Sequence, residues 1–394
     1  MSSRLRAPAR GQGFASRGLR PWVPLEVVGI WCEKPAMTSP KLYLAPLDGL
    51  RFFAFLAVFF HHMSDFTVSA VLDKMHNYGW VGVELFFLIS SFLFFHLLDA
   101  EYVKTGGIGV RNFFVRRFLR IYPLMILFPI AMLVIHGSPD GNGYFRLAGL
   151  ALFLDNAVAW FKSYNLSIPN TAHLWTLSFE FQVYLLIPFV FLAYRRFGKT
   201  VFLGALLTVF VYCFLARMTV YSLGASHPII WVTPFLRPES VLCGMALYIL
   251  RPQWHWGFSI AVAVVAGAAF LSLAPPWVSP VASAFSYPLA ALMFGGLVDA
   301  GLRAPLLATV LSATPLRFLG RISYGLYVYH FAVIAYSNRD GNEGARTCHR
   351  TRDECRRLLD IVGNRADADN CSRDHQLLRF REVGGDVQSP VRCG

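Results

Sequence analysis

The first apolar segment of the sequence carries two ionisable side chains, Arg51 and His62, eleven residues apart. Eleven helical steps of about 100° end about 20° from the starting direction, so the two side chains share one helix face, about 16 Å apart. A guanidinium there can position or neutralise an anion, and an imidazole can accept a proton. The alternative is an arginine that snorkels to the lipid head groups and an interfacial histidine. Because ionisable groups inside a membrane span usually mark a functional pathway, we predict a catalytic role for both residues.

The second apolar segment begins with Gly82-Val83-Glu84 and continues through Ser90 and Ser91. Glu84 is expected at the same depth as His62, where a carboxylate could orient the imidazole and raise its basicity. The alternative is a carboxylate that reaches interfacial water. The two serines are interpreted as small residues that allow close helix packing.

Three arginines, Arg116, Arg117 and Arg120, precede the third apolar segment. Guanidinium groups bind phosphate bidentately, so the cluster suits a phosphate-bearing donor such as coenzyme A. The alternative is a topology signal, because positive charges accumulate in cytoplasmic loops. We predict that the cluster binds the donor.

A further segment reads His173-Leu-Trp175-Thr-Leu-Ser178-Phe-Glu180 and then reaches Tyr184. Glu180 follows His173 by seven residues, on nearly the same helix face and about 10 Å deeper. A carboxylate inside an apolar layer must be paired, hydrogen-bonded or protonated. We predict a catalytic role for Glu180 and substrate contacts for His173, Trp175, Ser178 and Tyr184.

The last apolar segment contains Tyr324, Tyr327 and Tyr329 and then His330, about three turns inside. The tyrosines fit an aromatic belt at the membrane interface. His330, within the span, is predicted to belong to the catalytic site.

The elements that position these residues must be membrane helices. The chain has 394 residues, of which 55% are hydrophobic and only 15% are charged, well below the charged fraction of about 25% in soluble domains. A spanning helix needs about 20 apolar residues. We predict an all-α polytopic bundle of about 9–10 helices, from the ten apolar runs at 46–64, 80–98, 118–136, 145–162, 173–194, 200–217, 229–250, 256–274, 280–299 and 318–336.

The positive charges of the loops determine the expected topology. The loops at 99–117 and 195–199 are rich in Arg and Lys and should be cytoplasmic. If all ten runs crossed the membrane, these loops could not all be cytoplasmic. Nine crossings place them on the cytoplasmic side if the run at 145–162 is re-entrant or interfacial. The net charge of +13 then reflects topology, and we expect a lipid bilayer as partner and no nucleic acid.

The two ends of the chain differ from its centre. Residues 1–43 are basic and predicted to be a disordered cytoplasmic extension, residues 44–336 form the transmembrane domain, and residues 337–394 are polar. This tail is a disordered extension, a small soluble cap or the product of a reading-frame change. The seven cysteines lack the spacing of a metal site, so no metal is expected.

Taken together, the Arg51-x10-His62 pair, the Arg116-Arg117-x-x-Arg120 run, the Ser178-x-Glu180 block and His330 resemble the acyltransferase 3 family of bacterial membrane proteins over about residues 44–333. Glu84 stands where that family commonly has Asp, and Ser91 replaces a frequent Gly. The family's closing helix after His330 is replaced by the polar tail.

The resemblance implies an O-acetyltransferase of the bacterial inner membrane. It would transfer an acyl group, usually acetyl, from acyl-CoA to a hydroxyl of a carbohydrate or lipid-linked glycan, with acetyl-CoA as donor substrate and no tightly bound cofactor. Two alternatives remain from the residues themselves. A proton-coupled transporter or flippase also uses intramembrane Arg, His and Glu, and the chain could be an inactive, truncated relative.

Overall fold

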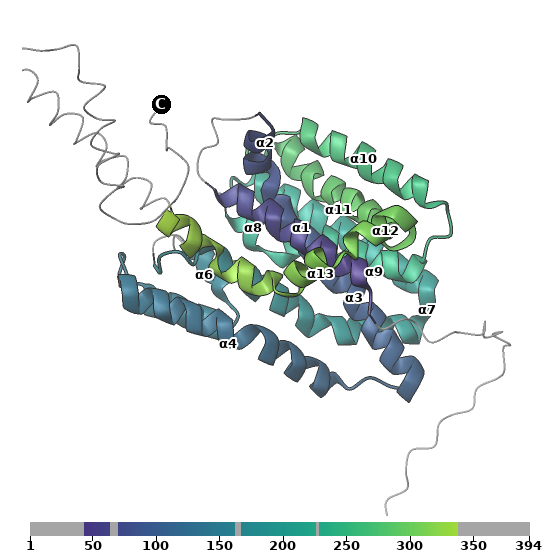
Figure 1. The fold of residues 1–394 in the computed structure, drawn as a ribbon, viewed down its shortest axis with the longest axis horizontal. Helices are drawn as coiled ribbons and strands as arrows, with labels where there is room; N and C mark the ends of the chain where they lie inside the picture. Colours follow the sequence, from purple (N-terminus) through teal and green to yellow (C-terminus); the bar gives the residue numbers. More distant parts are fainter. Residues whose placement is uncertain (1–42, 64–69, 162–166, 226–227, 338–394) are drawn as a thin grey trace, which may run out of the picture. The chain divides into compact units, whose positions relative to one another are not determined.

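The computed structural model describes residues 43–63, 70–161, 167–225 and 228–337, and every regular element in these ranges is a helix. The predicted all-α fold is therefore confirmed (Figure 1). The predicted basic extension and polar tail fall almost wholly outside the described residues and stay predictions.

Four described helical stretches are long and apolar enough to cross a membrane: Leu72–Thr105, Val110–His136, Ala172–Ser222 and Pro280–Arg303. They contain the helices α3 (Gly82–Thr105), α4 (Val110–His136), α7 (Trp175–Ser222) and α11 (Pro280–Arg303). Together with the family described below, they make the chain an integral membrane protein.

Helix α7 consists of two halves that meet at Gly198. This glycine has φ 80° and ψ 173°, a backbone conformation that side-chain-bearing residues rarely adopt. This non-helical conformation produces a kink between the two halves. The two apolar runs predicted at 173–194 and 200–217 are accordingly separate helical segments.

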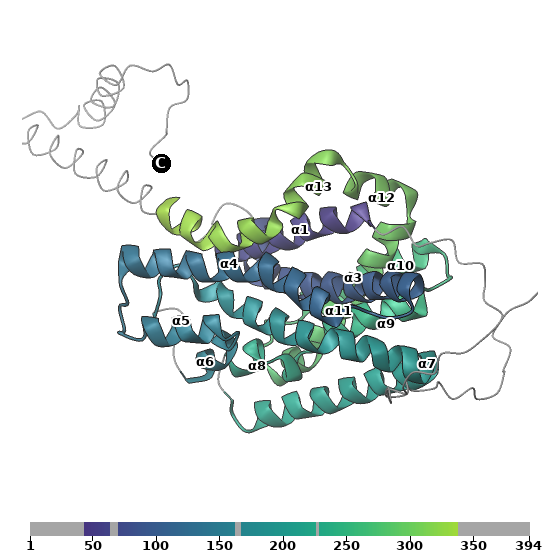
Figure 2. The ribbon, with the colours of Figure 1, turned by 90° about the horizontal axis from the view of Figure 1, so that it is seen from below.

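The apolar run at 145–162 forms two short helices, α5 (Gly143–Ala151) and α6 (Asp155–Phe161). Helix α5 packs against α4, and α6 packs against α5 (Figure 2). Each is far shorter than a membrane span, as the nine-crossing topology requires. Arg146 of α5 binds Asp155 of α6 through Nε at 3.1 Å and Nη2 at 3.2 Å, and both side chains are fully buried. This ion pair holds the two short helices together.

The other described helices are shorter or interrupted. The predicted run at 229–250 is broken into α8 (Ile229–Val232), the 3-10 turn η3 (Pro234–Leu236) and α9 (Glu239–Leu250). Pro234 and Pro238 explain the interruption, because proline cannot donate a backbone hydrogen bond. The remaining elements are α1 (Ala45–His62), α2 (Ala70–Tyr78), η1 (Gly79–Val81), η2 (Ala172–Leu174), α10 (Trp256–Ser272), α12 (Pro305–Leu311), α13 (Thr314–Arg321) and a helix over residues 323–337.

Helix α1 lies at the centre of the packing. It contacts α3, α11 and α13, and α1, α3 and α11 run side by side in Figure 1. Its buried positions Leu47, Leu50, Ala54 and Val58 follow the helical period of three to four residues. Arg51 follows Leu47 by four positions, and His62 follows Val58 by four, so both site residues lie at the edge of this buried face. Helix α1 therefore both fills the core and carries site residues.

A second buried ion pair connects α3 with the irregular segment before α9. Arg237 Nη2 lies 3.4 Å from Glu84 Oε1, and the two side chains are 0% and 1% exposed. The guanidinium is surrounded by aromatic rings, with the Trp231 ring centre 4.5 Å away. No hydrogen bond satisfies either carboxylate oxygen of Glu84 among the described residues. The ion pair and the surrounding rings are therefore the main compensation for burying these charges.

We expect Glu84→Ala to lower the free energy of unfolding by about 3–5 kcal/mol, because it leaves the buried Arg237 cation without its partner. The double variant Glu84→Ala/Arg237→Met should recover part of this loss. Unfolding in mixed micelles with increasing SDS would measure it. Arg116→Ala is the matched control, because it removes only an exposed contact with Glu101, worth about 0–1 kcal/mol. A loss for Glu84→Ala as small as for this control would contradict the interpretation.

Candidate functional site

A cavity of about 730 Å³, including the part open to solvent, lies between α1, α3, α4, the first half of α7 and the helix over 323–337. Its walls combine apolar rings with charged and hydroxyl groups: Arg51, Val83, Phe86, Phe87, Ser90, Phe94, Arg117, Arg120, Ile121, Thr176, Leu177, Glu180, Tyr184, Ser323, Tyr324 and Tyr327.

The cationic lining of the cavity comes from Arg51, Arg117 and Arg120. Arg51 is 13% exposed and its Nη1 lies 3.2 Å from Asp48 Oδ1. The Arg117 guanidinium lies 4.2 Å from the centre of the Phe94 ring, which holds it at the cavity wall by a cation–π contact. With three guanidinium groups around it, the cavity is suited to an anionic ligand.

Arg116 belongs to the predicted arginine cluster but does not line the cavity. Its side chain is 61% exposed and its Nη2 lies 3.8 Å from Glu101 Oε2. Neighbouring residues of a helix point about 100° apart, so Arg116 and Arg117 face different directions. Only two of the three predicted donor-binding arginines therefore reach the cavity.

Glu180 lies in the cavity with two hydroxyl groups. Ser90 Oγ donates to Glu180 Oε1 at 3.0 Å, and the Tyr184 hydroxyl donates to the same oxygen. These bonds fix a carboxylate in the otherwise cationic lining. Tyr184 was predicted as a substrate contact, whereas Ser90 was interpreted as a packing residue. Its contact with Glu180 depends on the packing of α3 against α7, which the sequence does not reveal.

His62, His173 and His330 form a histidine cluster, none of whose members lines the cavity. His330 Nε2 lies 3.1 Å from His62 Nδ1, and the ring centres of His173 and His330 are 4.6 Å apart. His173 and His330 are buried, whereas His62 is partly exposed. The sequence thus predicted three residues that the fold brings together from α1, η2 and the last described helix.

The hydrogen bonds of the cluster assign its protons. A carbonyl oxygen only accepts, so His330 Nδ1, 2.5 Å from the Tyr327 carbonyl oxygen, must carry a proton. In neutral His330 the Nε2 is then an acceptor, and His62 Nδ1 donates to it. Neutral His62 therefore has an unprotonated Nε2, which is the state that a general base requires.

Three predicted site residues lie elsewhere. Glu84 contacts Arg237 and accepts no hydrogen bond among the described residues, so its partner differs from the predicted His62. Trp175 is buried, with its ring centre 5.4 Å from the same guanidinium. Ser178 Oγ accepts a hydrogen bond from the backbone N–H of Asp155 at 3.3 Å. In the described structure these three side chains support the walls and do not line the cavity.

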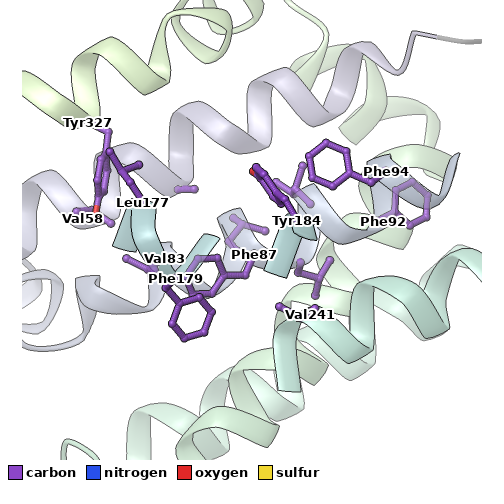
Figure 3. Close-up of a cluster of buried hydrophobic side chains, with 14 of the residues drawn as sticks. Val58, Val83, Phe87, Phe92, Phe94, Leu177, Phe179, Tyr184, Val241 and Tyr327 are labelled. Carbon is purple, nitrogen blue, oxygen red and sulfur yellow. The ribbon is translucent and has the colours of Figure 1, made fainter. Parts of the chain in front are cut away.

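Thr176 and Tyr327 separate the cavity from the histidine cluster. Both line the cavity, and the Tyr327 ring centre lies 5.2 Å from that of His173. In Figure 3, Tyr327 and Leu177 mark one end of the buried side-chain group, and Tyr184 and Phe94 lie toward the other. The sequence indicated Tyr327 only as an aromatic belt residue, because its contact with Thr176 is a tertiary one.

The arrangement can bind an anion and move a proton at separate places. Arg51 and His62 are eleven residues apart on the continuous helix α1, which corresponds to about 16 Å. The cationic cavity therefore suits a phosphate-bearing molecule, and the histidine cluster suits proton transfer. Within the described residues, no group of three or more His, Cys, Asp or Glu side chains is arranged to hold a metal ion.

The chain is similar to three curated bacterial proteins. It is 25% identical to "O-acetyltransferase OatA" of Staphylococcus aureus (strain NCTC 8325 / PS 47), over 77% of this chain and 52% of that protein. It is 26% identical to "Putative peptidoglycan O-acetyltransferase YrhL" of Bacillus subtilis (strain 168), over 76% of this chain and 50% of that protein. It is 25% identical to "Peptidoglycan O-acetyltransferase OatA" of Listeria monocytogenes serovar 1/2a (strain ATCC BAA-679 / EGD-e), over 75% of this chain and 50% of that protein.

The chain thus spans about half the length of these curated relatives. No solved structure matches it significantly. The acyltransferase 3 family, described as an acyltransferase domain, matches residues 44–346, which include the cavity and the histidine cluster. On this match over most of its length, the chain belongs to the acyltransferase 3 family.

Proposed function

We propose that the protein is an O-acetyltransferase of the bacterial inner membrane, which transfers an acetyl group from acetyl-CoA to a hydroxyl group of a glycan. The main support is the placement of a cationic cavity and a histidine cluster at two levels of one helix, α1. The relatives named as peptidoglycan O-acetyltransferases support the acceptor class.

In this proposal the donor binds in the cavity. Arg117 and Arg120 contact its phosphates, because guanidinium groups form charge-assisted hydrogen bonds to phosphate oxygens. Apolar side chains such as Phe86 and Leu177 line the path of the pantetheine arm. Arg51, about 16 Å from His62 along α1, is too distant to contact the same reacting carbonyl. Its proposed role is therefore to position the donor.

The chemical step takes place at His62. Its Nε2 accepts the proton of the acceptor hydroxyl while the hydroxyl oxygen attacks the thioester carbonyl carbon. The C–S bond then breaks, and the coenzyme A sulfur leaves and takes up the proton. The products are the acetylated glycan and coenzyme A with a free thiol. His330 keeps His62 in the required tautomer, and Glu180 orders the hydroxyls at the inner part of the path.

We expect His62→Ala to lower acetyl transfer by about 10²–10⁴-fold, the range for loss of a general base. The assay would measure label transferred from radiolabelled acetyl-CoA to peptidoglycan fragments by the purified protein. His136→Ala, a histidine at the end of α4 that contacts Tyr336, is the matched control and should retain activity. Full transfer by the His62 variant would remove this residue from the chemistry, and substrate movement without consumption of acetyl-CoA would indicate a transporter.

We expect Arg117→Ala and Arg120→Ala each to raise KM for acetyl-CoA by about 10- to 100-fold, because each removes a charged hydrogen-bond donor from the cavity. Arg116→Ala should change it little, because the Arg116 side chain faces Glu101. Steady-state kinetics at saturating acceptor would compare the three variants. An equal rise for all three would mean that the overall charge of the loop, and no specific cavity contact, binds the donor.

A further inference from the structure

The cavity has two ends of different character. The Arg117 guanidinium lies on Phe94 at one end, and Tyr327 lies at the other, as Figure 3 shows for the two rings. The histidine cluster begins directly behind Tyr327, whose ring centre is 5.4 Å from that of His330. Tyr327 therefore lies between the cavity that it lines and the His330 imidazole that contacts His62.

A hydrogen-bonded latch holds Tyr327 in place. Thr176 Oγ1 donates to the His173 carbonyl oxygen at 2.9 Å, which uses the only proton of that hydroxyl. The Tyr327 hydroxyl, 2.7 Å from Thr176 Oγ1, is therefore the donor in this contact. The same hydroxyl is 3.3 Å from the His173 carbonyl oxygen. Tyr327 is only 6% exposed, so the latch is shielded from competing water.

Tyr327 is also part of the histidine cluster through its backbone, because its carbonyl oxygen accepts the hydrogen bond from His330 Nδ1. The side chain thus closes the cavity while the main chain orients the imidazole that contacts His62. Tyr327 therefore affects both the access to the histidine cluster, through its side chain, and the orientation of His330, through its carbonyl oxygen.

From this geometry we propose that Tyr327 and Thr176 form a gate, which keeps water and protons in the cavity away from the histidine cluster until the acyl end of the donor displaces the tyrosine ring. Tyr327 is then a positioning residue. The inference rests on the proposed function. Its physical reason is that a reactive thioester must be shielded from water, and a continuous wet path lined by titratable groups would conduct protons across the membrane.

The test is the accessibility of a thiol behind the gate. Phe331, whose ring centre is 4.4 Å from that of His62, is replaced by cysteine in a chain whose native cysteines are serine. An impermeant anionic methanethiosulfonate is added to vesicles that expose the Arg117 end. Tyr327→Phe and Thr176→Val, which remove the latch hydroxyls, should each speed labelling about tenfold, the factor for loss of one hydrogen bond.

Tyr329→Phe is the matched control, because Tyr329 lies on the same helix with its ring half exposed, and it should leave the labelling rate unchanged. Val58→Cys, one helical turn before His62, provides a second reporter if Phe331→Cys does not fold. Rapid labelling with the intact latch, or no acceleration in Tyr327→Phe and Thr176→Val, would overturn the gate.

Labelling requires no acyl transfer, so the two proposals can fail separately. Accelerated labelling in a protein that does not consume acetyl-CoA would retain the gate and reject the proposed function. Normal acetyl transfer with latch variants that label at the unchanged rate would reject the gate alone.

Discussion

A charge inside an apolar helix bundle must have a partner, and this constraint organises the whole structure. The buried cations divide into two kinds. Arg146, Arg217 and Arg237 are completely enclosed with a carboxylate each, and the pairs connect α5 with α6, α7 with α9, and α3 with the segment before α9. Arg51 and Arg117 instead line a cavity that is open to solvent. Enclosure thus distinguishes charges that hold helices together from charges that can meet a ligand.

The same constraint explains why the site has two parts. Clustered guanidinium groups repel one another and would keep a nearby imidazole from gaining a proton. The helix α1 separates Arg51 from His62 by three turns, and Tyr327, which lines the cavity, also contacts the rings of His173 and His330. The histidine cluster can therefore exchange protons without the electrostatic field of the cavity arginines at short range. In the proposed function, the long flexible arm of the donor would span this separation.

The sequence predicted the features of the fold that depend on local periodicity, namely the positions of helices and the residues that share a helix face. Apolar runs located the helices, and the eleven-residue spacing placed Arg51 and His62 on one face of α1. It could not reveal contacts that depend on how distant helices pack. Glu84 looked like a partner for His62 because both were expected at the same depth, but depth does not determine direction, and α3 turns this carboxylate toward Arg237. Ser90 gave no signal, because a serine that packs helices and one that binds Glu180 look alike in sequence.

Helix α13, which precedes the last described helix, makes one close backbone contact with α1. An added Cβ on Gly320 would lie 1.8 Å from the Asp48 carbonyl oxygen, so only glycine allows α13 to approach α1 this closely. The Asp48 side chain meanwhile binds Arg51. Ten residues after Gly320, the chain delivers His330 to His62. Because Asp48 of α1 both binds Arg51 and contacts Gly320 of α13, a shift of α13 would alter the arginine part and the histidine part of the site together.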